Sequence, residues 1–239
     1  MGVALHHLLS GRKALNWAVV SCMVLAGWLV PGLHQSAWAQ AVTTCHQAAE
    51  KGGDGPLDFG AYCWIDFSPL DLAQAKSGPG QNFQVNLRGG AYLTFTLRIV
   101  PGNAAGTNMY AVAVPSWSGA AFGNSAFNDI PGNPILYQDI ENQTNPQNTV
   151  TLSNLTLHAN GSTDLPFVFV AADGESSNAD EYIVLTTTGD PWALVSAPGI
   201  SHPNRNMPIL TPATAVGQNT GSQTVTIDGT AAGTEDEGS

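Results

Sequence analysis

Charged side chains are scarce in this sequence. They make up 10% of 239 residues, well under the roughly 25% usual in soluble proteins. Only 7 are Lys or Arg, against 18 Asp or Glu. All the acidic residues but only five of the basic ones lie beyond residue 40, so that part of the chain carries a formal net charge of 5 − 18 = −13. Such a negative field repels phosphate backbones, which excludes nucleic-acid binding and disfavours anionic membranes.

Long apolar runs are missing beyond residue 40, and the one uncharged apolar stretch lies near the N-terminus, at 14–30. It follows Arg12 and Lys13 and precedes a small-residue cleavage motif at 37–39, although a cut two residues later fits the same rule. This order is typical of a signal peptide, so 1–39 is predicted to be one. The mature chain is then exported, either secreted or held at the cell surface, and is not transmembrane after cleavage. The alternative is an uncleaved membrane anchor, for which the stretch is short.

Cysteine is rare as well, with three in the chain. Cys22 falls in the predicted signal peptide, which leaves Cys45 and Cys63 in the mature protein. Two cysteines in an exported protein most simply form a disulfide, and one of this spacing stabilises a fold by roughly 3 kcal/mol. Metal ligation is the alternative, but only His46 is adjacent as a further ligand.

Helical periodicity is absent: no segment from residue 40 onward keeps an apolar period of 3.6 over three turns. Residues 82–87 instead alternate polar and apolar side chains, and 92–99 do the same after an Arg-Gly-Gly turn. This pattern predicts a β-hairpin with one buried face. The inward side chains are then Leu93, Phe95, Leu97 and Ile99.

Further short strands are expected along the rest of the chain, at 62–67, 110–114, 135–137, 149–157, 167–171, 182–187, 193–195 and 223–227. One short helix is expected at 68–76, with Ser68 as its cap and Pro69 in its first turn. About ten strands joined by regular turns predict one all-β sandwich domain at 42–229, with an up-and-down barrel as the alternative. The small, polar and acidic end, 230–239, is expected to be a disordered tail or linker.

Catalytic signatures are missing. The sequence contains no G-x-S-x-G elbow, H-E-x-x-H pair, P-loop or dinucleotide-binding glycine pattern. The mature chain has three histidines, and none lies beside a nucleophile in sequence. We therefore expect no enzymatic activity. The alternative is a carbohydrate-active enzyme without an obvious signature.

The densest acidic cluster lies at 173–181, between two predicted strands. Its carboxylates include Asp173, Glu175 and Asp180, which could supply oxygen ligands to calcium. The spacing is not that of an EF-hand, and a solvated loop is the alternative. No cofactor is expected other than this calcium.

The stretch at 114–127 carries three aromatic residues among many small ones and has no charge. Small residues allow close approach and Trp offers a flat apolar face, a combination that suits sugar stacking or a protein anchor. Trp117, Phe122 and Asn124 are the candidate ligand-binding residues. In the alternative, Trp117, Phe122 and Phe127 pack inward beneath a long loop.

Four phrases of the sequence resemble a known family when taken in order: YCWIDFS at 62–68, PSWSGAAFGNSAF at 115–127, IPG with PILYQ within 130–138, and AADGES at 171–176. They are similar to the ligand-binding non-repetitive domain of the CshA/CshB-type fibrillar surface adhesins, from about 45 to about 195. The resemblance implies a lectin-like or jelly-roll-type antiparallel β-sandwich at the tip of a surface fibril. It also implies adhesion to host matrix, with a fibronectin-type partner, and no catalysis. It points to no individual binding residue.

The sequence as a whole favours an exported, non-enzymatic adhesin domain that binds an extracellular matrix protein or a glycan. Its Ser, Thr and Asn content suits a hydrogen-bonding, moderately wet interface. The alternative is a structural subunit of a surface layer or filament with no soluble ligand.

Overall fold

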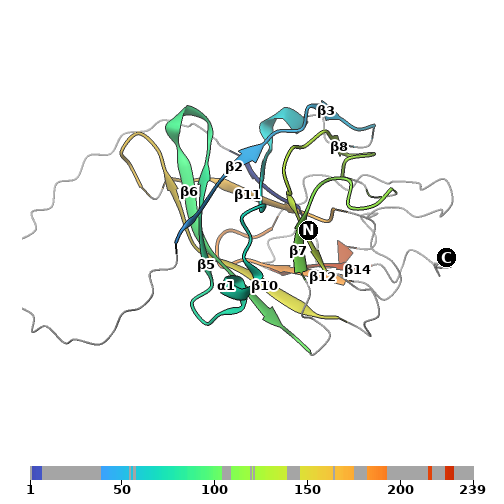
Figure 1. The fold of residues 1–239 in the computed structure, drawn as a ribbon. Helices are drawn as coiled ribbons and strands as arrows, with labels where there is room; N and C mark the ends of the chain where they lie inside the picture. Colours follow the sequence, from blue (N-terminus) through green and yellow to red (C-terminus); the bar gives the residue numbers. More distant parts are fainter. Residues whose placement is uncertain are drawn as a thin grey trace, which may run out of the picture.

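The structure, a computed structural model, describes residues 2–6, 39–53, 55, 58–103, 109–118, 120, 122–138, 146–163, 165–174, 182–192, 215–216 and 224–228. Residues 2–6, 182, 215–216 and 224–228 are described by their backbone alone. Strands dominate the described residues (Figure 1), which confirms the predicted all-β class. The predicted strand at 193–195 and the predicted tail at 230–239 lie outside the described residues.

The predicted hairpin is present. Strand β5 (Gln81–Asn86) pairs antiparallel with β6 (Tyr92–Pro101), and β10 (Asn148–His158) pairs antiparallel with the other edge of β6. The turn at Arg88–Gly90 places both of its glycines at positive φ, where an L side chain is strained. The expected inward side chains are confirmed, since each is at most 2% exposed: Leu93, Phe95, Leu97 and Ile99.

One strand pair departs from the antiparallel arrangement that the sequence predicts. Strand β2 (Ala41–His46) pairs parallel with β5, and antiparallel with β4 (Cys63–Ile65) on its other side. A parallel pair needs a long crossover, which the chain supplies because β4 and a short helix separate β2 from β5. Strand β2 therefore joins the two parts of a nine-stranded curled sheet, in the order β10-β6-β5-β2-β4-β1-β9-β7 with β11 against β1.

The second part of this sheet includes a strand from the extreme N-terminus. The backbone of β1 (Gly2–His6) pairs with β11 (Val168–Ala172) over five residues, and also with β4 and β9 (Ile135–Gln138). Strand β7 (Met109–Val112) pairs with β9 at the edge. Although β1 falls within the predicted signal peptide, most of 1–39 lies outside the described residues, so the signal peptide stays a prediction.

Two smaller sheets complete the described strands. Strands β12 (Tyr182–Thr186), β14 (Thr224–Asp228) and β13 (Ala215–Val216) form one, in that order. Strands β3 (Glu50–Lys51) and β8 (Phe127–Asn128) form the other. A 3₁₀ turn, η1 (Phe59–Ala61), precedes β4, and a second, η2 (Arg88–Gly90), is the turn between β5 and β6.

The expected short helix is present but begins later than predicted. Helix α1 (Leu72–Lys76) is capped by Asp71, whose carboxylate accepts two backbone N–H groups of the first turn at 2.9 and 3.1 Å. Ser68, the predicted cap, instead donates its backbone N–H and its hydroxyl to Asp66. The prediction of Ser68 as cap is therefore wrong, because a nearer carboxylate binds its polar groups.

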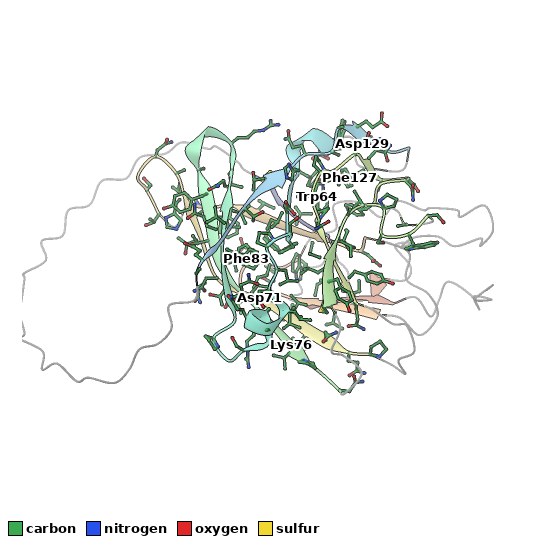
Figure 2. All side chains as sticks on the ribbon, viewed as in Figure 1. Trp64, Asp71, Lys76, Phe83, Phe127 and Asp129 are labelled. Carbon is green, nitrogen blue, oxygen red and sulfur yellow. A yellow bond between two sulfur atoms is a disulfide. The ribbon has the colours of Figure 1, made fainter. Side chains whose placement is uncertain are left out.

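Two hydrophobic clusters lie on opposite faces of β4 and β9. Ile65 and Leu136 belong to the first, which fills the space inside the curled sheet, whereas Trp64 and Ile135 belong to the second. All four side chains are at most 3% exposed. The segment 120–130 covers the outer face of these strands and adds Phe122, Ala126, Phe127 and Ile130 to the second cluster. Figure 2 labels Phe83 in the first cluster and Trp64 and Phe127 in the second.

Candidate functional site

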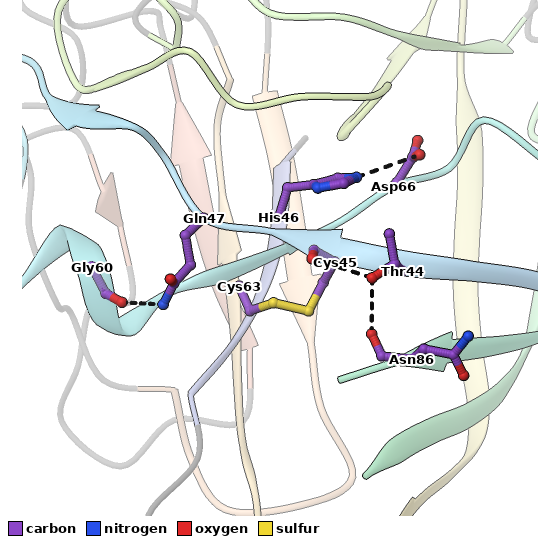
Figure 3. Close-up of a disulfide and its surroundings, with 8 residues drawn as sticks. All are labelled: Thr44, Cys45, His46, Gln47, Gly60, Cys63, Asp66 and Asn86. Atoms are coloured by element: carbon purple, nitrogen blue, oxygen red, sulfur yellow. Dashed lines mark hydrogen bonds and ion pairs between the residues drawn. A yellow bond between two sulfur atoms is a disulfide. The ribbon is translucent and has the colours of Figure 1, made fainter. Parts of the chain in front are cut away.

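Cys45 and Cys63 form a disulfide, as predicted (Figure 3). Their Cα atoms lie 5.3 Å apart and the bond ties β2 to β4, at the point where the two parts of the large sheet meet. Both sulfurs are thereby committed, so the metal-binding alternative for these cysteines does not hold. Among the residues that the structure describes, no group of three His, Cys, Asp or Glu side chains is placed to hold a metal ion.

Asp66, directly after β4, gathers the strongest polar contacts near the disulfide. Its Oδ1 accepts the Ser68 backbone N–H at 2.9 Å, the Ser68 hydroxyl at 2.6 Å and the Asn133 backbone N–H at 2.9 Å. Its Oδ2 lies 3.9 Å from His46 Nε2. Burial alone raises the pKa of Asp66, but these hydrogen bonds, together with the nearby His46, outweigh it and lower the pKa.

These contacts give Asp66 a structural role. Its carboxylate joins the end of β4 to the turn that leads into β9, through Asn133. Because Oδ1 already accepts three hydrogen bonds from the protein, little capacity remains there for a ligand. Asp66 was not singled out from the sequence, and its position after an apolar run is a weak signal.

The segment at 114–127 packs inward through two of its aromatic residues. Phe122 is 4% exposed, and its ring centroid lies 4.7 Å from that of Trp64 in an edge-to-face contact. Phe127 is equally buried, with its centroid 5.1 Å from that of Trp64. The expectation that Phe122 contacts a ligand is therefore corrected, because Trp64 on β4 offers it an apolar partner that the sequence could not reveal.

Trp117 and Asn124 lie closer to the surface than Phe122. Trp117 is half-buried, and Asn124 is exposed. The Asn124 side-chain amide donates to the carbonyl oxygens of Ser118 at 3.1 Å and Ala120 at 3.0 Å, which holds this segment in shape. A ligand contact by Trp117 or Asn124 stays a prediction.

The three candidate calcium ligands are described only in part. Asp173 follows β11 and is 8% exposed, while Glu175 and Asp180 lie outside the described residues. The carbonyl oxygen of Gly174, the residue after Asp173, accepts the Phe122 backbone N–H at 3.2 Å. This hydrogen bond attaches the start of the acidic loop to the 114–127 segment. Calcium binding stays a prediction.

A second candidate surface lies on the outer side of β10, β6, β5 and β2. Because the side chains of a strand alternate between its two faces, the residues between the buried positions of these strands share this outer side. The register places His158 beside Tyr92, Tyr92 beside Asn86, and Thr156 beside Thr94. We call this surface the polar face; its residues are Gln40, Asn82, Gln84, Asn86, Tyr92, Thr94, Thr96, Asn154, Thr156 and His158.

The polar face contains a hollow of about 300 Å³. Five residues with amide or hydroxyl side chains line it: Gln40, Asn82, Thr94, Thr96 and Asn154. Phe83 and Phe95 also line it, by their backbone, because their side chains point to the opposite face of the sheet. No charged side chain is among the described residues that line it. This volume is at the lower end of the range for small-molecule sites in proteins.

Hydrogen bonds connect the side chains around the hollow. Thr96 donates its hydroxyl to Asn82 Oδ1 at 2.9 Å, and the Asn154 amide donates to Thr96 Oγ1 at 3.4 Å. Asn154 lies in an irregularity of the β10–β6 pairing and has a positive φ of 55°. Such bulges change the direction of a side chain relative to the regular strand.

An aromatic pair lies beside the hollow. The rings of Tyr92 and His158 are stacked, with centroids 4.4 Å apart and planes 9° from parallel. The imidazole also shares a hydrogen bond with Thr94, at 3.2 Å between His158 Nε2 and Thr94 Oγ1. This pair places a flat, partly apolar surface at one end of a row of hydrogen-bonding groups.

The polar face was not predicted from the sequence, although the hairpin that supplies half of it was. The available signal was the kind of polar residue at the outward positions of 82–99, where amides and hydroxyls replace the usual Lys and Glu. Their grouping with Asn154 and His158 depends on the pairing of β10 with β6, which joins residues 47 to 66 positions apart.

A family comparison adds independent information. Residues 60–237 match the family described as surface adhesin CshA non-repetitive domain 2, which covers well over half of the chain. No curated protein and no solved structure shows a significant match. Within the described residues, none of the helices has both the length and the apolar character that a bilayer crossing requires.

Proposed function

The chain belongs to the family of the surface adhesin CshA non-repetitive domain 2, and from this premise we propose that it binds a host-matrix protein of fibronectin type, or a glycan, at the bacterial surface. Membership implies a cell-surface or extracellular location and a non-enzymatic role. The observation that carries the proposal is the family match over 60–237. The segments that supply both hydrophobic clusters fall largely within that range.

Export is part of the proposal. The predicted signal peptide at 1–39 would direct the chain out of the cytoplasm. Outside the cell, the oxidising environment would preserve the Cys45–Cys63 disulfide. The strongly acidic mature chain would avoid anionic lipid and remain available to partners outside the cell.

The test is binding of the purified protein to immobilised fibronectin and to a printed glycan array, with calcium and with a chelator. We expect concentration-dependent, saturable binding to one of them, and none to immobilised albumin. Loss of binding in the chelator alone would show that binding requires calcium. Absence of binding to both surfaces under both conditions would overturn the proposal.

A Trp117→Ala variant belongs in the same experiment. If it abolishes binding while the midpoint of thermal unfolding is unchanged, the adhesive surface includes the 114–127 segment. If it binds as the wild type does, the contact surface lies elsewhere on the domain, and the polar face is the next surface to change.

A further inference from the structure

We infer that the hollow on the polar face binds a neutral saccharide, through side-chain amides and hydroxyls with the Tyr92–His158 pair as a flat platform at its end. This inference rests on the proposed adhesin function and deepens it, since it names the ligand chemistry and the surface. It is independent of the 114–127 segment, whose described residues cover the outer face of β4 and β9 and include none that lines the hollow.

The charge distribution selects a neutral ligand. The chain beyond residue 40 carries a formal charge of −13, so an anionic ligand is repelled before it arrives. A cationic ligand would require carboxylates, and the described lining of the hollow has none. Arg98, the next outward residue of β6, is exposed but lies outside the lining.

The hydrogen-bonding groups match sugar hydroxyls. A hydroxyl both donates and accepts, as do an amide side chain and a threonine, so each lining group can pair with a sugar in either sense. The lining offers three amides, Gln40, Asn82 and Asn154, and two hydroxyls, Thr94 and Thr96. Several are already bound to one another, which fixes their positions before a ligand arrives.

Two features distinguish this surface from an ordinary solvated strand face. The irregular backbone at Asn154, with φ 55°, lets β10 contribute an amide where the regular alternation is interrupted. Across the same strands, the Tyr92 and His158 rings stack on each other, so each ring has only its other side to offer to the apolar face of a sugar. A solvated face would be expected to carry Lys and Glu instead.

The size of the hollow limits the ligand. At about 300 Å³ it has room for a small group such as the end of an oligosaccharide, and none for a folded protein domain. A protein partner would have to contact the rim of the polar face, where Val42 is 57% exposed. Binding to a matrix protein through this hollow therefore means binding to its attached sugars.

The test uses Thr96→Val, which removes the lining hydroxyl that is hydrogen-bonded to both Asn82 and Asn154, while it keeps the β-branched shape that the strand favours. The matched control is Thr149→Val, an exposed position on β10 outside the hollow. A second variant, Asn82→Ala, removes an exposed amide that lines the hollow from β5. All three proteins and the wild type are checked by thermal unfolding and then applied to an array of neutral and sialylated or sulfated oligosaccharides.

We expect the wild type and Thr149→Val to bind neutral oligosaccharides, and both hollow variants to bind them at least tenfold more weakly with unchanged thermal midpoints. If Thr96→Val lowers the midpoint, Asn82→Ala decides the result. Absence of binding to neutral glycans, binding to anionic glycans alone, or full binding by both hollow variants would overturn the inference. If the protein binds fibronectin stripped of its glycans but binds no neutral oligosaccharide, the adhesin proposal stands while this inference fails.

Discussion

Gly132 lies against the carboxylate of Asp66 so closely that a side chain at position 132 has no room. A Cβ placed there would come within 2.5 Å of Asp66 Cγ and within 2.7 Å of both carboxylate oxygens. The backbone at Gly132 also has a φ of +79°, which L side chains rarely adopt. The turn before β9 therefore wraps around the carboxylate, and Asn133 donates its backbone N–H to Asp66 from within that turn.

Replacing Gly132 by Ala should destabilise the fold. The new Cβ meets Asp66 and the backbone is strained, so the free energy of unfolding should fall by about 1–3 kcal/mol. The measurement is chemical denaturation of the purified variant. The matched control is Gly78→Ala, where nothing lies within 4 Å of the added Cβ. Equal losses in the two variants would contradict the described contact.

Asp66 should make stability depend on pH in the acidic range. Its pKa is lowered in the folded state, so its contribution is present above the unfolded value of about 3.9 and is lost as the pH falls through the folded pKa. The free energy of unfolding of the Asp66→Asn variant should therefore differ most from that of the wild type above about pH 4. The difference between the two proteins should become smaller below that pH. Urea unfolding of both proteins from pH 6 downward measures this difference; a difference that stays constant would contradict the assignment.

The disulfide should contribute measurably to stability. Removing it in the double variant Cys45→Ala/Cys63→Ala should lower the free energy of unfolding by roughly 3 kcal/mol, because the unfolded chain regains the freedom that the closed loop removes. Thermal unfolding with and without reductant provides the check. Reductant should lower the midpoint of the wild type and leave the double variant unchanged. A wild type that is insensitive to full reduction would contradict the expectation.

Phe122 should act as a core residue. Phe122→Ala removes a ring packed between Trp64 and Phe127, and should cost about 3–5 kcal/mol of stability. Tyr110→Ala is the matched control, since Tyr110 is 48% exposed on β7 and its truncation should cost about 1 kcal/mol or less. Denaturant unfolding compares the two. A Phe122→Ala variant as stable as Tyr110→Ala would return Phe122 to the surface as a ligand candidate.

The sequence predicted those elements whose signals are local. Alternation at 82–87 and 92–99 gave the β5–β6 hairpin and its buried side chains, because one face of each strand is covered and the other is not. The run at 62–67 showed no alternation, since Trp64 and Ile65 on β4 are buried on opposite faces. The parallel β2–β5 pair could not be predicted, because nothing local specifies which distant strand lies beside β2.

The candidate sites also divide into features that a local sequence signal predicts and features that depend on distant parts of the chain. The pairing of Cys45 with Cys63 followed from their small number and from export. The direction of Phe122 did not, because its burial depends on Trp64, far away in sequence. The polar face could not be predicted without the β10–β6 register, which brings Asn154 and Thr96 into hydrogen-bonding distance.

Adhesion itself tests the central claim most directly. Beads coated with the purified protein are passed in flow over surfaces carrying fibronectin, neutral oligosaccharides or albumin, and the attached beads are counted. The account predicts attachment to the fibronectin or the oligosaccharide surface that soluble protein blocks, and none to albumin. Attachment no greater than that of uncoated beads on every surface would contradict the account.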